Sequence, residues 1–383
     1  VQLKQDGGNL GDPVELNAGN NYTHTWAELP RYKTGTTLFD YTVEEDTTGF
    51  NEGVVFDTVT YSGIDETNDT ITGTIKNKYV IPTDGTATAT KTWVNGPVAD
   101  HTAVTINLYR EATGTPRELV PNAPAPVVVG SAPTFNYTWS GLEKTNAAGE
   151  PYTFTVEEVG VVDGKITVDG REYAVTQDEN NITNTYVIPT DGTATATKTW
   201  VNGPTSRPTV WFKLYRQIEG GTEEEVPVAQ APIKELPNGT TSVEWTGLAR
   251  TDNNGNVYTF SVKEVNAAGA DFTPTNYTKA ESGLTVTNTY TQPETEEDVV
   301  GTKVWVNGPK PAVAFELWRK NGDANTGVKV DGPKAVNPTS NTVNFGKQLK
   351  TDINGVEYEY FVVEPVTPDN YTKAEDGLTV TNT

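Results

Sequence analysis

Hydrophobic and polar residues alternate with a period of two along most of the chain, and no long stretch has the 3.6-residue period of a helix. Thr, Val and Tyr are frequent in the alternating stretches, and Asn-Gly, Asp-Gly and Pro separate them. Short alternating runs between turn residues predict β-strands with one buried face. We therefore expect an all-β protein built from β-sandwiches of about seven short strands each.

Internal repetition divides the chain. The string YVIPTDGTATATKTWVNGP occurs at 79–97 and again at 186–204, and a shorter relative, GTKVWVNGP, occupies 301–309. Each copy opens a segment that continues through a Tyr-rich stretch and closes on a Thr-rich stretch, which predicts tandem domains. We place these domains at residues 1–81, 82–188, 189–292 and 293–383, and the first of them lacks its first strand. The short Pro-containing joints predict semi-rigid spacing and a monomeric rod.

The repeated opening stretch carries a lysine on its inward face. Side chains alternate between the two faces of a strand, so residues two apart share a face. In ATATKTW, the Ala and Trp residues share a face with Lys, and the Thr residues occupy the other face. The face with small and aromatic side chains is the one expected to be buried. This places three lysines in domain cores: Lys91, Lys198 and Lys303.

The same alternation buries an acid and an amide in each domain. The Tyr-rich stretches place a glutamate on the face of their aromatic and Val residues, at Glu158, Glu264 and Glu364. The closing Thr-rich stretches place an asparagine on the face of their Ile, Leu and Val residues, at Asn184, Asn288 and Asn382. The first domain has the corresponding Glu45 and Asn77 but no lysine strand, and Lys4 is expected to point outward beside an inward Leu3.

Three polar residue types on inward faces require an explanation, because an unpaired buried charge is costly. One such residue alone could lie at a strand end with its charged group in water. The same three types in the same order in three domains favour a shared core site instead. Desolvation favours the neutral amine and the neutral acid. The amine could then attack the Asn amide carbon, which the Glu carboxyl polarises through a hydrogen bond to the amide oxygen, and loss of ammonia would leave an amide cross-link.

These features resemble the B-type repeat domains of the collagen adhesin (Cna-B), which also occur in pilins of Gram-positive bacteria. The resemblance rests on the K-x-W opening, the Y-x-F/Y-x-V-x-E stretch and the closing T-N-T-Y, and it covers nearly the whole chain. It implies a reverse-immunoglobulin, transthyretin-like sandwich with a Lys–Asn isopeptide bond and a catalytic Glu. The implied sets are Lys91, Glu158 and Asn184; Lys198, Glu264 and Asn288; and Lys303, Glu364 and Asn382. The first domain, with Glu45 and Asn77, departs from this pattern.

Composition excludes several other functions. A formal net charge of −23 argues against nucleic acid or an anionic membrane as a partner. The chain has no Cys, and its two His residues, His24 and His101, lie far apart, so we expect no metal site and no cofactor. No apolar run reaches the roughly 18 residues of a membrane span. The loops 251–258 and 351–358 resemble Ca²⁺ loops but lack the full ligand series, so we expect hairpin turns there.

We expect the stalk of a cell-wall-anchored, extracellular surface adhesin, with no enzymatic activity beyond one autocatalytic turnover per domain. The alternatives are a host-ligand-binding module and a pilin subunit. Near-identical second and third domains favour spacing over recognition, and we find no sortase signal or pilin-linkage Lys motif. A host extracellular protein or glycan would then bind through regions outside this sequence, which we interpret as an internal fragment. The missing first strand either precedes Val1 or is added by another chain, which would then bond to Asn77.

Overall fold

The computed structural model describes residues 1–322 and 326–383, and strands dominate this part of the chain. Its helices are two short 3₁₀ turns, η1 (Ala18–Asn20) and η2 (Val98–Asp100). The all-β expectation is therefore confirmed. The chain splits into two compact units, Val1–Val187 and Ile188–Thr383, each of which we describe by itself. Each unit holds two groups of strands, which we call modules: the first module is Gln2–Tyr79, the second Gly85–Tyr186, the third Gly192–Tyr290 and the fourth Val300–Asn382.

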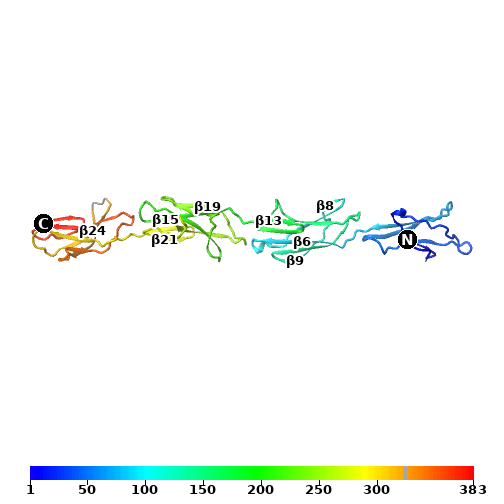
Figure 1. Cartoon of the computed structure of the whole chain (residues 1–383), viewed down its shortest axis with the longest axis horizontal. Coiled ribbons are helices and arrows are strands. Elements are labelled where there is room, and N and C mark those ends of the chain that lie inside the picture. Colours follow the sequence, from blue (N-terminus) through cyan, green and yellow to red (C-terminus); the bar gives the residue numbers. More distant parts are fainter. Residues whose placement is uncertain (323–325) are drawn as a thin grey trace. The chain divides into compact units, whose positions relative to one another are not determined.

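The N-terminal unit contains the first and second modules (Figure 1). The strands of the first module are β1 (Gln2–Gln5), β2 (Gly8–Asn9), β3 (Tyr41–Glu44), β4 (Val54–Tyr61) and β5 (Gly73–Tyr79). The strands of the second module are β6 (Gly85–Val94), β7 (Ile106–Ala112), β8 (Thr115–Leu119), β9 (Val127–Ser131), β10 (Thr134–Leu142), β11 (Thr153–Glu158), β12 (Lys165–Val168), β13 (Arg171–Asp178) and β14 (Asn181–Tyr186).

The C-terminal unit contains the third and fourth modules. The strands of the third module are β15 (Gly192–Val201), β16 (Val210–Ile218), β17 (Glu224–Glu225), β18 (Lys234–Leu236), β19 (Ser242–Leu248), β20 (Tyr258–Val265), β21 (Tyr277–Ser282) and β22 (Thr285–Tyr290). The described strands of the fourth module are β23 (Val300–Trp305), β24 (Ala314–Asn321), β25 (Val328–Ala335), β26 (Thr342–Asn344), β27 (Tyr358–Val363), β28 (Lys373–Asp376) and β29 (Thr379–Asn382).

The second, third and fourth modules are sandwiches of two sheets. The second module packs the sheet β12-β13-β14-β6-β10-β9 against β11-β7-β8. The third packs β19-β15-β22-β21 against β17-β16-β18, with β20 also paired to β16, and the fourth packs β26-β23-β29-β28 against β25-β24-β27. The opening strand of each module pairs in parallel with its closing strand: β6 with β14, β15 with β22, and β23 with β29. These modules have the predicted reverse-immunoglobulin, transthyretin-like fold.

The core of each sandwich is built from the inward faces that the alternation predicts. Along β15, Ala194, Ala196 and Lys198 are buried, whereas the Thr residues between them are exposed. The alanines leave room for a large side chain from the neighbouring strand, and Trp245 of β19 packs with them in one cluster. Because side chains on this strand alternate between core and solvent, the lysine cannot leave the core without a change of register.

The first module is less regular than the others. Its sheet β2-β1-β3 pairs β1 with β3 in antiparallel fashion, as β16 pairs with β20 in the third module. The second sheet consists of β4 and β5. The counterparts of Trp26 in the next two modules, Trp139 and Trp245, lie on β10 and β19, which pair with the opening strands. The residues around Trp26 form no strand.

An Asn-Gly turn ends the opening strand of the second, third and fourth modules, as WVNGP predicts. In the third module, Asn202 and Gly203 have φ values of 60° and 81°. A Cβ atom on Gly203 would lie 2.6 Å from the Tyr277 hydroxyl oxygen. Tyr277 lies edge-on against Trp200, with ring centroids 5.0 Å apart. Glycine is therefore required both for the left-handed backbone and for the close approach of this tyrosine.

We predict that Gly203→Ala destabilises the third module more than Gly239→Ala does. Both glycines have positive φ, so both substitutions incur the roughly 1–2 kcal/mol cost of a left-handed Ala. Gly239 has no heavy atom within 4 Å of its Cβ position, so Gly203→Ala alone adds the clash with Tyr277. Amide hydrogen exchange of β15 and β22 measures the local free energy of opening. Equal exchange in the two variants would contradict the packing argument.

Candidate functional site

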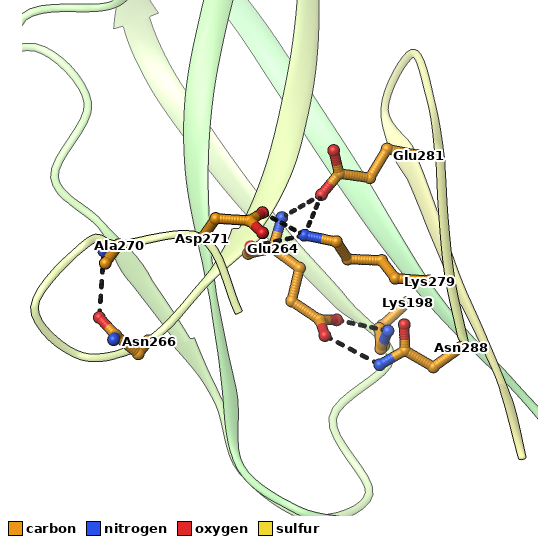
Figure 2. A network of polar contacts seen from close by, with 8 residues as sticks. All are labelled: Lys198, Glu264, Asn266, Ala270, Asp271, Lys279, Glu281 and Asn288. Atoms are coloured by element: carbon orange, nitrogen blue, oxygen red, sulfur yellow. Dashed lines mark hydrogen bonds and ion pairs between the residues drawn. The ribbon is translucent and has the colours of Figure 1, made fainter. Parts of the chain in front are cut away.

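Three polar side chains meet in the core of each complete sandwich. In the third module, Lys198 comes from the opening strand β15, Asn288 from the closing strand β22, and Glu264 from β20 in the facing sheet (Figure 2). The parallel register places Lys198 opposite Val286 and Trp200 opposite Asn288. The lysine and the asparagine therefore face the core one pleat apart on adjacent strands.

The glutamate bridges the other two side chains. In the third module, Lys198 Nζ lies 2.5 Å from Glu264 Oε2, and Asn288 Nδ2 donates to Glu264 Oε1 at 2.8 Å. The equivalent distances are 2.8 and 2.9 Å in the fourth module. They are 3.4 and 3.0 Å in the second. The structure thus brings together each predicted set: Lys91, Glu158 and Asn184; Lys198, Glu264 and Asn288; Lys303, Glu364 and Asn382.

All nine side chains are removed from solvent. Their exposed fractions lie between 0% and 6%, the larger value being that of Glu158. In every set the asparagine Oδ1 is buried and accepts no hydrogen bond from the described residues. Most buried polar side-chain atoms in folded proteins have a hydrogen-bond partner, so the same exception in three modules is unusual for a purely structural site.

Burial shifts the lysines toward the neutral form. Desolvation lowers the pKa of Lys91 to about 8, although the nearby Glu158 carboxylate raises it. Burial also lowers the pKa of Lys198 and of Lys303, again against the opposing effect of the paired glutamate. The Trp two residues further along the strand covers each amine, with Nζ 4.3, 4.4 and 4.6 Å from the ring centroid in the second, third and fourth modules. With this pKa a fraction of Lys91 is neutral near neutral pH, and burial acts in the same direction on Lys198 and Lys303.

The orientation of the amide differs from the sequence-based expectation. The glutamate was expected to donate to the asparagine oxygen, but in all three sets the amide nitrogen donates to the carboxylate. The physical reason is the ion pair, because a carboxylate beside a lysine is an acceptor and turns the NH₂ group toward itself. A single carboxylate therefore contacts both nitrogens and can carry a proton from one to the other.

The first module holds two members of the set. Asn77 Nδ2 donates to Glu45 Oε1 at 3.0 Å, and Glu45 Oε2 is buried without a hydrogen-bond partner in the described residues. Asn77 itself is exposed, and β5 pairs with β4 alone among the described strands. Lys4 forms an ion pair with Glu44 on β3, in the other sheet, while its neighbour Leu3 is buried. Lys4 does not complete the set, in agreement with its predicted outward direction.

Sequence reasoning missed a second group of charged residues around the glutamates. Lys279 and Glu281 lie on β21, and Lys373 and Glu375 lie on β28. In both modules these side chains contact the backbone of the catalytic glutamate candidate. The signal was available in the sequence, because the string YTKAE occurs at 277–281 and again at 371–375.

The two loops that resemble Ca²⁺ sites are turns. Asp252 Oδ1 accepts from the backbone of Asn254 and Asn256, and an isolated bridge joins Thr251 to Val257. The loop at 351–358 has the same arrangement around Asp352. Within residues 1–322 and 326–383, no cluster of three or more His, Asp and Glu is placed to hold a metal ion. The helices of the described residues are too short to cross a membrane.

Comparison with known proteins identifies one family along the chain. The Cna protein B-type domain matches residues 1–72, 87–185, 194–289 and 299–383. The collagen adhesin of Staphylococcus aureus is 34% identical over 270 residues, which are 69% of this chain and 21% of the relative. The chain thus spans about a fifth of the length of that relative.

Similar solved structures include B repeats and a pilus adhesin. The two B repeat units (B1B2) of the collagen binding protein of Staphylococcus aureus are 22% identical, with 100% of this chain and 92% of that chain covered and a TM-score of 0.32. The pilus adhesin SpaC from Lactobacillus rhamnosus GG is 14% identical, with 77% and 34% covered and a TM-score of 0.27. Because the family match recurs in four successive segments that together include most of the sequence, the chain belongs to the Cna protein B-type domain family.

Proposed function

We propose that the chain is a stalk segment of a cell-wall-anchored bacterial surface adhesin, in which the second, third and fourth modules each form a Lys–Asn isopeptide bond without another enzyme. One observation carries this proposal. A buried Lys–Glu–Asn set recurs at the same strand positions in three modules, and the lysine and asparagine lie on strands that open and close the module. Such a bond would join the two ends of each sandwich covalently.

The contacts support a balanced single-turnover reaction. The neutral lysine amine attacks the asparagine Cγ, and the glutamate accepts a proton from Nζ at Oε2. The carboxyl group then delivers a proton to Nδ2, the Cγ–Nδ2 bond breaks, and ammonia leaves. An amine and an amide become a new amide and ammonia, and the glutamate returns to its starting state. Fixing the reactants in the core makes the step intramolecular.

A bond in this position suits a segment that bears force. In the second module the closed loop would run from Lys91 to Asn184. By analogy with disulfides, a cross-link that closes a loop of about this length stabilises the folded state by roughly 4–5 kcal/mol, because it lowers the conformational entropy of the unfolded chain. Its mechanical effect is larger, because tension entering at β6 and leaving at β14 passes through the covalent bond and bypasses the residues between them.

The repetition supports spacing as the role. The second and third modules share a string that includes β6 and β15, and their strands carry the same inward set. The net charge of −23 favours a soluble, self-repelling surface segment. The relative named collagen adhesin supports a place on the bacterial cell surface.

We predict that the intact mass of the 383-residue chain is lower than its sequence mass by three molecules of ammonia. The three complete sets each lose one, and the first module loses none because Lys4 lies in the other sheet. High-resolution mass spectrometry of the denatured chain measures this difference directly. Peptide mapping should find the branched pairs Lys91–Asn184, Lys198–Asn288 and Lys303–Asn382. A measured mass equal to the sequence mass would refute the proposed bonds.

We predict that Glu264→Gln removes the bond of the third module and leaves the other two intact. A glutamine preserves the shape of the side chain but cannot accept the lysine proton, so bond formation should slow by about 10²–10⁴-fold. Glu244→Gln, at an exposed position on β19, is the matched control and should retain all three bonds. The readout is the number of ammonia molecules lost. A Glu264→Gln chain that still bonds Lys198 at the original rate would exclude the glutamate from catalysis.

We predict that bond formation in the second module accelerates with pH up to about 8, the lowered pKa of Lys91. Only the neutral amine has a free lone pair, so the rate should rise about tenfold per pH unit below that value and level off above it. Chain recovered unfolded from inclusion bodies in urea is refolded at a series of pH values, and the Lys91–Asn184 peptide is quantified over time. A rate that falls as the pH rises toward 8 would contradict nucleophilic attack by this lysine.

A further inference from the structure

A charged pair on β21 holds the backbone of Glu264. Glu281 Oε1 accepts from the Glu264 backbone N–H at 2.8 Å, and Lys279 Nζ donates to the Glu264 carbonyl oxygen at 3.2 Å. The two side chains also pair with each other at 3.1 Å, and Asp271 contacts Lys279 at 2.5 Å. Figure 2 shows this network directly beside the Lys198–Glu264–Asn288 set.

The fourth module repeats the arrangement. Glu375 Oε1 accepts from the Glu364 backbone N–H at 2.7 Å, and Lys373 Nζ donates to the Glu364 carbonyl oxygen at 2.5 Å. Lys373 and Glu375 pair at 2.9 Å. In both modules the lysine of the pair lies opposite the bonding asparagine in the strand register, Lys279 opposite Asn288 and Lys373 opposite Asn382. The residues at these two positions therefore make the same contacts in the third and in the fourth module.

The second module has different residues at these positions. Val175 lies opposite Asn184, and Gln177 donates to the Val156 carbonyl oxygen instead of contacting Glu158. The central contact differs as well, because Lys91 Nζ lies 3.4 Å from the Glu158 carboxylate, compared with 2.5 and 2.8 Å in the third and fourth modules. Glu158 is 6% exposed as a whole residue, with its side chain 1% exposed, whereas Glu264 and Glu364 are completely buried.

We propose that Lys279–Glu281 and Lys373–Glu375 are positioning residues for isopeptide bond formation, which make the third and fourth modules bond faster than the second. This proposal rests on the proposed function. The pair binds both the backbone N–H and the backbone C=O of the glutamate, and so fixes the position of its Cα near the end of β20 or just after β27. Reaction rates depend steeply on such placement, since a displacement of about 1 Å can cost 10²-fold.

The pair acts through position more than through charge. Burial is the main cause that lowers the pKa of Lys198, and the charges of Lys279 and Glu281 act on that pKa in opposite directions. A lysine and a glutamate in contact leave little net field at the reacting nitrogen. By contrast, Lys279 and Glu281 each form a hydrogen bond to the Glu264 backbone, and these two bonds hold it in place.

The test follows each bond separately in the full chain. Chain unfolded in urea from inclusion bodies is refolded, and peptide mapping quantifies the three branched peptides over time. Bonds in the third and fourth modules should form on the order of tenfold faster than the Lys91–Asn184 bond. Glu281→Ala should slow the third module by a similar factor, whereas Glu281→Gln, which can still accept from the Glu264 N–H, should restore much of the rate. The second and fourth modules of the same molecules are internal controls.

A transplanted pair separates positioning from general stabilisation. Val175→Lys with Gln177→Glu should accelerate the second module toward the rate of the third. In every variant the bond rate is taken relative to the folding rate of that module, measured by amide hydrogen exchange protection of its closing strand. Equal rates in the three wild-type modules, or a Glu281→Ala chain that bonds as fast after folding as the wild type, would overturn the proposal. Absence of every bond would instead refute the proposed function.

Discussion

Burial of a lysine on the opening strand is the constraint on which each complete module depends. A lone buried ammonium is unfavourable, so the core must supply a partner, and the glutamate of the facing sheet is that partner. The parallel pairing of the first and last strands then places the asparagine against the same carboxylate. The alanines beside the lysine, the Trp that covers its amine and the register of the strands all serve this arrangement.

Such a site would be poor as a purely structural ion pair. The buried asparagine Oδ1 accepts no hydrogen bond from the described residues in any of the three modules. Replacing buried ion pairs with hydrophobic residues is often neutral or stabilising, so stability alone gives little reason to retain one three times. Conversion of the amine and the amide into a neutral amide removes the buried lysine charge. The unfavourable polar contacts of the unbonded core thus favour the reaction that the proposed function requires.

Much of this site could be predicted from the sequence because β-strand alternation has a fixed period of two. Once Ala and Trp mark the inward face of β6 or β15, the face of the lysine follows, and Glu158 or Asn184 follows in the same way. Alternation does not report which strands become neighbours, so the contact of Lys279 with the Glu264 backbone was not predicted. It also carries no information on side-chain torsions, which is why the amide of Asn288 was expected in the opposite orientation. The strands that carry the equivalent tryptophans, β10 and β19, are each paired with an opening strand. The residues around Trp26 form no strand, so strand formation at this position depends on pairing with an opening strand and not on the local sequence pattern alone.

Differences between the modules matter because covalently linked modules carry tension in series. Under a common force, extension begins in whichever module has no bond across its two ends, however stable the others are. The first module holds Glu45 and Asn77 without a lysine between its sheets, and the second lacks the charged pair that fixes the glutamate in the third and fourth. Backbone placement of the glutamate therefore has a consequence beyond the rate of one reaction. If the modules bond as proposed, this placement determines how long a newly folded module remains extensible, and so which part of the chain yields before every available bond has formed.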